Sequence, residues 1–278
     1  MKIDGNTGVL GIIGDPVAHS GSPALHNFMA DRLGDNLVYV PFPVKPAGLA
    51  TAIQGAYRLG IRGMNVTVPH KQSVLEEVTE LDDAALSIGA VNTLVRVRGG
   101  YKGYNTDYSG FMRQLDHDSV IVYDKPVIVL GAGGAAHAVI YALEKIGASE
   151  IFLLNRSRDK AEKDFGKKKN VRILGFEDWE KIPEARYICI QCTSVGLAPK
   201  TEECVIRDEK FFGLIETGVD LIYQPRETVF MKKVREHGGR AYNGLRMLMY
   251  QAVAAYELFA DREVPDQVLE ELYEQLDP

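Results

Sequence analysis

The feature that most constrains this chain is a glycine-rich turn between a predicted strand and a predicted helix. Residues 126–130 form a compact β-branched run typical of a buried parallel strand, and residues 131–136 follow with the pattern G-x-G-x-x-A. The turn opens a predicted helix over residues 134–146. Gly131 permits the tight turn and Gly133 lets the backbone approach a pyrophosphate, so this arrangement predicts a dinucleotide site. A turn that only packs two elements together is the alternative.

The end of the next predicted strand indicates which dinucleotide is bound. NAD enzymes usually place a carboxylate about 20 residues after the glycine turn, where it holds the ribose hydroxyls. Here that position falls on Asn155, and Arg156, Ser157, Arg158 and Lys160 follow. Guanidinium and hydroxyl groups bind a 2′-phosphate that a carboxylate would repel, so NADP is favoured over NAD. An exposed helix start with Asp159 nearby is the alternative.

The whole chain alternates short apolar runs with amphipathic segments, which predicts an α/β fold. At about 150 residues per domain, the length of 278 residues favours two domains. Strands are expected at 9–13, 37–44, 63–68, 90–97 and 101–104 in the first half, and at 126–130, 150–154, 171–174, 186–191 and 216–222 in the second. Helices are expected from Ser22 as N-cap, at 46–59, within 108–125, and at 134–146, 158–169, 228–237, 245–261 and 265–276.

Composition and charge exclude several classes of protein. The chain is 46% hydrophobic and 25% charged, with a formal net charge of −6, so neither disorder nor a general attraction to nucleic acid or anionic membrane is expected. Residues 1–10 have no apolar core of a secretory signal, and the most apolar stretch is broken by glycines. Three cysteines and six scattered histidines predict no disulfide framework and no metal site, and a reducing cytoplasm is the expected compartment.

Polar residues in the first half suggest a second site. Ser20 and Ser22 flank a glycine at a predicted helix start, where two hydroxyls suit a small anion such as a carboxylate, although helix capping explains one of them. Lys71 follows a predicted strand at the end where α/β sheets place ligands, and Asp107 lies at the junction of the two halves. A lysine and an aspartate that meet there form a candidate proton-transfer pair, although a surface lysine and a capping aspartate are commoner.

These residues and several further motifs together resemble the shikimate dehydrogenase family. The matches run in family order over nearly the whole chain: His19–Pro23, Asn65–Lys71, Gly89–Thr93, Gly103–Asp107, Gly131–Ala136, Asn155–Ser157, Thr193–Gly196, Asp220–Tyr223, and Gly244–Leu248 with Gln251.

The resemblance implies two α/β domains and a known reaction. It implies a substrate and catalytic domain over 1–107, an NADP-binding Rossmann domain over 108–243, and helices over 244–278 that return to the first domain. The implied activity is the reversible NADPH-dependent reduction of 3-dehydroshikimate to shikimate, a step toward chorismate and the aromatic amino acids. The sequence does not decide the oligomeric state, and a homodimer is one of the assemblies that it allows.

The resemblance also implies roles for individual residues. Lys71 and Asp107 would be the catalytic pair, with Lys71 exchanging the hydroxyl proton and Asp107 holding Lys71. The implied substrate-binding set is Ser20, Ser22, Thr67, Lys71, Asn92, Asp107, Tyr223 and Gln251. The implied cofactor-binding set is Gly131, Gly133, Gly134, Ala135, Asn155, Arg156, Ser157, Lys160, Thr193 and Gly244.

Some positions depart from the family pattern, and rival functions stay open. His70 stands where Phe is frequent, His137 where Arg is frequent, and Gln191–Cys192 where Asn-Ala is commoner. The nearest rival is a quinate/shikimate dehydrogenase able to use NAD, and a related folate dehydrogenase is more distant. An NADP-binding regulator without activity would need neither Lys71 nor Asp107. The Cys189-x-x-Cys192 pair lies on a predicted strand, where a buried structural role is favoured over a redox role.

Overall fold

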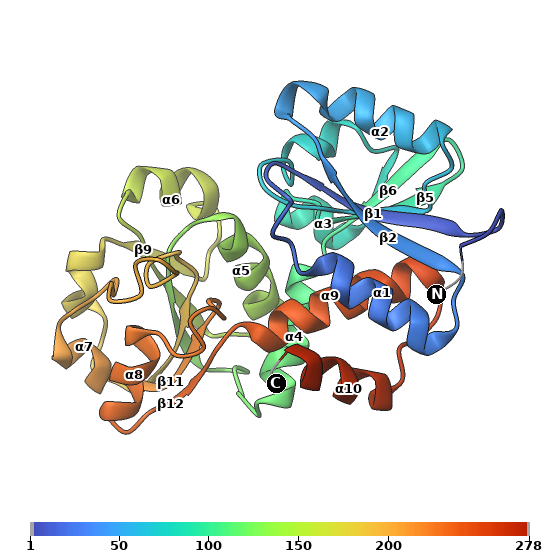
Figure 1. The fold of residues 1–278 in the computed structure, drawn as a ribbon. Helices are drawn as coiled ribbons and strands as arrows, with labels where there is room; N and C mark the ends of the chain where they lie inside the picture. The colour runs from blue at the N-terminus through green and yellow to red at the C-terminus, as the bar shows by residue number, and fades with distance from the viewer. Residues whose placement is uncertain (1–2, 277–278) are drawn as a thin grey trace. The chain divides into compact units, whose positions relative to one another are not determined.

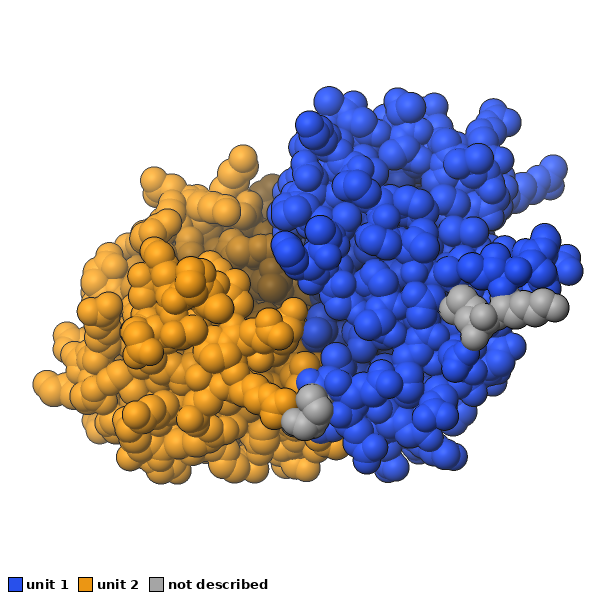
Figure 2. All heavy atoms as spheres, in the orientation of Figure 1, with its two compact units in different colours: residues 1–110, 248–278 blue, residues 111–247 orange. Residues whose placement is uncertain are grey.

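The computed structural model describes residues 3–276, which fold into two compact units. Unit 1 contains the residues up to 110 and those from 248 onward, and unit 2 contains residues 111–247 (Figure 2). Each unit is built on a six-stranded sheet with helices, which confirms the predicted α/β class and the return of the C-terminal helices to the first unit. Within the described part of the chain, no helix is long and apolar enough to cross a membrane.

The sheet of unit 1 is mixed, because a hairpin extends three parallel strands. Its strand order is β2-β1-β3-β5-β6-β4. The first three strands are parallel, β5 pairs antiparallel with β3 and β6, and the short β4 pairs parallel with β6. The strands are β1 (Gly8–Gly14), β2 (Leu37–Pro43), β3 (Gly63–Val66), β4 (Glu80–Leu81), β5 (Thr93–Val97) and β6 (Gly100–Tyr104).

Alternating residues of these strands feed two separate hydrophobic cores, one on each face of the sheet. Leu10 and Ile12 of β1 pack with α1, α9 and α10, whereas Ile13 packs with α2 and α3. The C-terminal helices therefore complete the core of unit 1 (Figure 1). The helical elements are α1 (Ser22–Leu33), η1 (Pro46–Gly48), α2 (Leu49–Arg58), η2 (Ser73–Glu76), α3 (Asp83–Ile88), α9 (Leu245–Ala260) and α10 (Asp266–Leu276).

The sheet of unit 2 is entirely parallel and has the strand order of a dinucleotide-binding fold. The order β12-β11-β10-β7-β8-β9 runs outward in both directions from β7 and β10, which are the central pair. A ligand site is expected at the carboxyl ends of these two strands. The strands are β7 (Pro126–Leu130), β8 (Glu150–Leu154), β9 (Val171–Leu174), β10 (Tyr187–Gln191), β11 (Ile215–Asp220) and β12 (Arg240–Tyr242).

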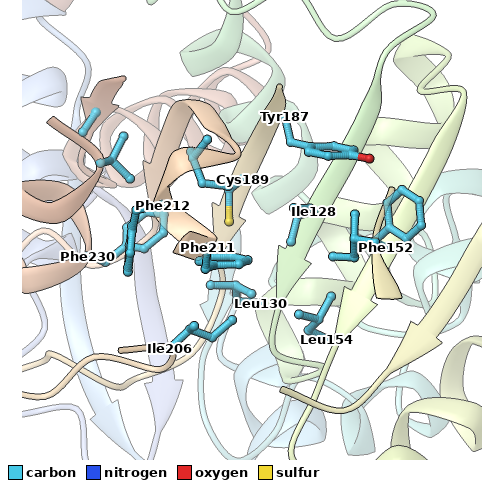
Figure 3. Packing of buried hydrophobic residues seen from close by; sticks show 14 of the residues in the cluster. Ile128, Leu130, Phe152, Leu154, Tyr187, Cys189, Ile206, Phe211, Phe212 and Phe230 are labelled. Carbon is cyan, nitrogen blue, oxygen red and sulfur yellow. The ribbon is translucent and has the colours of Figure 1, made fainter. Parts of the chain in front are cut away.

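One face of this sheet carries an aromatic core (Figure 3). Ile128 and Leu130 of β7 point into it, together with Phe152 of β8, and Phe211 and Phe212 close it from α7. Right-handed crossovers place α5 and α6 on the opposite face, because β8 and β9 extend the sheet in the other direction from β11 and β12. The helical elements are α4 (Asp107–His117), whose residues 107–110 belong to unit 1, α5 (Gly134–Ile146), α6 (Arg158–Phe165), η3 (Phe176–Lys181), α7 (Glu209–Gly213) and α8 (Val229–Glu236).

The structure corrects several local predictions. Ser22 is not the N-cap of α1: Gly21 occupies that position without a side-chain cap, and the Ser22 N–H donates to Ser20 Oγ instead. Helix α6 is four residues shorter than the predicted 158–169, because its apolar contacts end at Phe165 and a turn follows at Gly166. The short elements β4, β12 and α7 carry too few residues to show a periodic pattern.

A buried histidine lies in the core between α1 and the sheet of unit 1. The His26 ring is stacked on Tyr39 with centroids 4.2 Å apart and an interplanar angle of 2°. It is 1% exposed, and its Nδ1 atom has no hydrogen-bond partner among the described residues. Burial lowers the pKa of His26 to about 3, and the neighbouring Asn65 side chain opposes only part of this effect.

We expect His26 to make unit 1 sensitive to acid. Its pKa is lower in the folded chain than in the unfolded chain, so its contribution to stability is complete above pH 6.5 and is lost as the pH falls toward 3. The loss amounts to about 1.4 kcal/mol for each pH unit within that window. Urea unfolding at a series of pH values should therefore show a shallower decline for His26→Phe than for the parent chain. His19→Phe, at an exposed histidine, should follow the parent, and a parallel decline in His26→Phe would contradict the assignment.

Candidate active site

An ion pair in unit 1 joins two residues that the sequence singled out. Lys71 Nζ donates to Asp107 Oδ2 at 2.6 Å. The two side chains are 31% and 14% exposed, respectively, so the pair is partly shielded and still reachable by a small molecule. Lys71 lies in the segment after β3, and Asp107 is the first residue of α4, so the fold brings together groups 36 positions apart.

A buried asparagine holds the aspartate in place. Asn92, which is 2% exposed, donates through Nδ2 to Asp107 Oδ1 at 2.8 Å and to Thr106 Oγ1 at 3.0 Å. Its Oδ1 accepts from the Thr106 backbone N–H at 2.7 Å and from the Thr93 hydroxyl at 2.9 Å. Both oxygens of Asp107 therefore have a donor, and the carboxylate has one defined orientation.

The backbone around Lys71 is anchored at three points. The Lys71 carbonyl accepts from the Val91 N–H at 2.8 Å, and the His70 carbonyl accepts from Val74 at 2.9 Å. The His70 ring is 1% exposed, and its Nε2 lies 2.6 Å from the Val44 carbonyl. A carbonyl only accepts, so Nε2 carries the proton in this contact. His70 thus ties the lysine-bearing loop to the end of β2.

The two serines lie at the start of α1, and both are half-buried. Ser20 Oγ accepts from the Ser22 N–H at 3.2 Å. Burial raises the pKa of Tyr39, and hydrogen bonding with the Ser22 side chain opposes part of this effect. The Tyr39 hydroxyl donates to Asn65 Oδ1 at 2.8 Å, and Asn65 in turn donates to the Thr93 hydroxyl at 3.1 Å. A chain of hydrogen bonds therefore links the serines to the asparagine cluster.

Three further residues of the expected substrate-binding set lie on separate elements. Thr67 is half-buried directly after β3, and its N–H donates to the Ile13 carbonyl at 2.9 Å. Gln251 belongs to α9 in unit 1, where its amide donates to the Leu248 carbonyl at 2.8 Å. Tyr223 is half-buried in unit 2, in the segment after β11.

The glycine turn of unit 2 has the geometry that a pyrophosphate needs. Gly131 has a φ of +96°, and a Cβ there would lie 2.5 Å from the Thr193 methyl, so only glycine fits. A Cβ at Gly133 or Gly134 would meet nothing within 4 Å, so this side of the turn is open. Helix α5 begins here without a side-chain cap, which leaves its first N–H groups available to an anion. The residues fit the pyrophosphate of a dinucleotide.

The segment after β8 fits the adenosine end of such a ligand. Asn155 accepts from the Ala132 N–H at 3.2 Å and donates to the Ser157 carbonyl at 2.8 Å, which joins this segment to the glycine turn. Arg156, Ser157 and Lys160 are exposed at the start of α6. They carry two positive charges and a hydroxyl at the strand end where NAD enzymes place a carboxylate.

Thr193 and Gly244 also lie at the carboxyl end of this sheet. Thr193 follows β10 and packs its methyl group against Gly131, and the Gly244 N–H donates to the Ile222 carbonyl at 3.1 Å. Cys189 is buried in β10, and burial raises the pKa of both Cys189 and Cys192, which does not favour a reactive thiolate. Among the described residues, no three His, Cys, Asp or Glu side chains are grouped to hold a metal ion.

Sequence reasoning missed several residues that build this site. Tyr39, Asn65, Thr93 and Thr106 position Asn92 and Asp107 but were not in the expected set. One signal was present: Tyr39 occupies a position that strand alternation buries, and a buried tyrosine hydroxyl needs a partner. Gln191 and Asp220, which hydrogen bond to each other in unit 2, gave no comparable signal.

Comparisons with known proteins show which family the chain belongs to. A family model described as "Shikimate dehydrogenase substrate binding domain" matches residues 12–94. The curated shikimate dehydrogenase (NADP(+)) of Moorella thermoacetica is 39% identical over 277 residues, covering 97% of this chain and 94% of that protein. The chain belongs to the shikimate dehydrogenase family.

Solved structures of the family have the same fold over the full chain. A chorismate mutase/shikimate 5-dehydrogenase fusion protein from Clostridium acetobutylicum matches with a TM-score of 0.92 and 34% identity, covering 98% of each chain. Shikimate 5-dehydrogenase from Listeria monocytogenes, in complex with shikimate and NAD, matches with a TM-score of 0.90 and 29% identity, covering 99% of this chain and 98% of that one. These matches support the predicted domain types.

We expect the Tyr39 hydroxyl to contribute measurably to the stability of unit 1. Tyr39→Phe leaves Asn65 Oδ1 buried without its donor, which should lower the free energy of unfolding by about 1–3 kcal/mol. Urea denaturation measures this change. Tyr123→Phe, at a tyrosine that is 72% exposed, is the control and should change stability by less than about 0.5 kcal/mol. Equal effects of the two substitutions would contradict the hydrogen-bond network described here.

Proposed function

We propose that this chain is an NADP-dependent shikimate dehydrogenase, which reduces 3-dehydroshikimate reversibly to shikimate. The observation that carries the proposal is the Lys71–Asp107 pair, with both carboxylate oxygens occupied and the lysine partly exposed. A regulator without activity has no need of such a pair. Full-length similarity to a curated enzyme of that name supports the same activity.

The proposed substrate-binding set is the one that the family resemblance implies, and it suits shikimate, a cyclic hydroxy acid. We propose that Ser20 and Ser22 bind its carboxylate at the start of α1, where hydroxyl donors and the helix terminus favour an anion. Thr67, Asn92, Asp107 and Gln251 would hydrogen bond to the ring hydroxyls. We assign Tyr223 to the same set as a residue of unit 2.

We propose that Lys71 is the proton donor and acceptor of the reaction. When bound, NADPH would supply the hydride that reduces the carbonyl carbon of the substrate. As negative charge develops on the carbonyl oxygen, the Lys71 ammonium stabilises it and transfers a proton to it. Asp107 holds Lys71 through one oxygen, while Asn92 fixes the other oxygen. In the oxidation direction Lys71 accepts the hydroxyl proton, and solvent restores its protonation state afterwards.

The cofactor-binding set is proposed from the carboxyl edge of the parallel sheet. Gly131, Gly133, Gly134 and Ala135 would line the pyrophosphate at the start of α5, and Asn155, Arg156, Ser157 and Lys160 would hold the adenosine phosphate. Thr193 and Gly244 would complete the site. The Listeria monocytogenes structure contains NAD, so the preference of this chain for NADP over NAD has to be measured.

The nearest alternative is activity on quinate, which has an extra hydroxyl on the carbon that bears the carboxylate. Both Ser20 and Ser22 are present at the proposed carboxylate site, which favours shikimate.

We also propose a cytoplasmic location, supported by three free cysteines. A homodimer is the proposed alternative to a monomer, and light scattering coupled to size-exclusion chromatography distinguishes the two.

Lys71→Met should abolish most of the activity, because it removes the transferable proton while keeping the side-chain length. We expect kcat to fall by about 100-fold or more. The measurement is the initial rate of cofactor reduction with shikimate or quinate, each paired with NADP or NAD. Lys45→Met, at an exposed lysine outside the site, is the control and should retain the parent rate.

The outcomes of this assay separate the candidate functions. Rapid turnover of shikimate with NADP that collapses in Lys71→Met supports the proposal. A preference for quinate or NAD transfers the chain to the quinate/shikimate alternative. Tight NADP binding without turnover of either substrate would sink the enzyme assignment and favour a regulator.

Arg156→Glu should weaken NADP selectively, because it places a carboxylate where the 2′-phosphate is proposed to bind. We expect the KM for NADP to rise at least about tenfold, which corresponds to about 1.4 kcal/mol, while the KM for NAD changes little. Lys163→Glu reverses a charge within α6, seven residues further along the chain than Arg156, and should leave both constants nearly unchanged. Equal increases for NADP and NAD would refute the phosphate contact.

A further inference from the structure

The topology of unit 2 divides a bound dinucleotide between two groups of strands. Strands β7, β8 and β9 form one mononucleotide-binding half, and β10, β11 and β12 form the other. The glycine turn after β7 fits the pyrophosphate, and the segment after β8 fits the adenosine phosphate. The nicotinamide half therefore falls to the segments after β10 and β11.

Gln191, the last residue of β10, organises the first of these segments. It is 1% exposed, and its Oε1 accepts from the Thr193 N–H at 2.5 Å. Its Nε2 donates to the Val195 carbonyl at 3.2 Å. One side-chain amide thus satisfies two backbone groups of the same short loop, which also contains a bond from the Val195 N–H to Thr193 Oγ1 at 3.1 Å.

Asp220, the last residue of β11, organises the second segment. Its side chain is fully buried, and Oδ1 accepts from the Ile222 N–H at 3.0 Å and from Gln191 Nε2 at 3.3 Å. Oδ2 accepts from the Thr228 hydroxyl at 2.6 Å, and Thr228 caps α8 through the Met231 N–H. Burial raises the pKa of Asp220 to about 6, against the opposing effect of these donors.

The Gln191–Asp220 bond joins the two segments into one structure. It holds Thr193, whose methyl group packs on Gly131, and it holds the segment that runs through Tyr223 to α8. We propose that Gln191, with Asp220, is a positioning residue that fixes the loops after β10 and β11 and thereby sets the affinity for the nicotinamide half of the cofactor. This inference rests on the proposed use of NADP.

The requirement at position 191 is specific. The side chain accepts one hydrogen bond and donates two, which only a neutral amide of this length does. Methionine keeps the length but loses all three bonds. Glutamate keeps the acceptor for Thr193 but places a second carboxylate against Asp220 and an acceptor against the Val195 carbonyl. Both substitutions should free the loop after β10: methionine removes its hydrogen bonds, and glutamate introduces repulsive contacts.

The test is equilibrium binding of NADPH, followed by cofactor fluorescence in the absence of substrate. We expect Gln191→Met and Gln191→Glu to raise the Kd at least about tenfold. Steady-state kinetics should show the KM for NADP rising by a larger factor than the KM for shikimate, because Tyr223 alone of the proposed substrate-binding set lies on the two segments that Gln191 and Asp220 hold. Amide hydrogen exchange at Thr193 should accelerate, because its N–H loses its acceptor.

Tyr187→Phe is the matched control on the same strand. It removes a buried hydroxyl that donates to the Pro183 carbonyl at 2.8 Å, at the opposite end of β10. It should lower the thermal stability without changing the Kd for NADPH. A loss of affinity in Tyr187→Phe equal to that in Gln191→Met would show that general destabilisation is the cause, which overturns the inference.

A double-variant cycle tests the coupling to Asp220. Asp220→Ala should also raise the Kd, and Gln191→Met/Asp220→Ala should raise it by less than the product of the single effects, because both remove one shared constraint. Independent effects, or an unchanged Kd in folded Gln191→Met, would overturn the inference.

A parent chain that binds NADPH but does not turn over shikimate would overturn the proposed function and leave this binding test valid. A parent that does not bind NADPH would overturn both.

Discussion

Buried side-chain amides satisfy the backbone groups where strands of both sheets give way to loops. Asn92 donates to Thr106 and Asp107 and accepts from the Thr106 N–H in unit 1, and Gln191 bonds to Thr193 and Val195 in unit 2. A buried polar group without a partner costs about 1–3 kcal/mol, so each amide constrains its loop to one conformation. The functional geometry on both sheets depends on this constraint, because Asn92 orients Asp107 and Gln191 orients the loop after β10.

The long elements were predictable from sequence because their signals are repetitive. The β-branched run at residues 126–130, the glycine turn after it and the alternation in residues 37–43 each follow from a period or a backbone requirement. The Rossmann strand order then follows from right-handed crossovers. Lys71 and Asp107 were identifiable as candidates from their places in motifs, and the resemblance to a family joined them into a pair.

The network around the pair was not predictable, because hydrogen bonding between distant strands leaves no periodic trace. Asn65 and Thr93 are 28 positions apart, and Gln191 and Asp220 are 29 apart. A polar residue in a strand can lie at an exposed edge or hydrogen bond to a buried partner. The register between the paired strands determines which of the two occurs. The predicted N-cap of α1 was wrong for a local reason: α1 already includes Ser22, so Gly21 is the N-cap and the Ser22 N–H donates to Ser20 Oγ.

The degree of burial suits the Lys71–Asp107 pair to proton transfer. An ion pair in full solvent contributes about 0–1 kcal/mol and would not hold one geometry, whereas full burial would impose a desolvation cost of several kcal/mol per ion. With exposures of 31% and 14%, the pair lies between these limits. Asn92 occupies the second oxygen of Asp107 with a neutral donor, so the carboxylate is fixed without a second cation. An ammonium has three protons and Lys71 donates one of them to Asp107, so Lys71 keeps donors for a substrate oxygen while solvent can restore its proton.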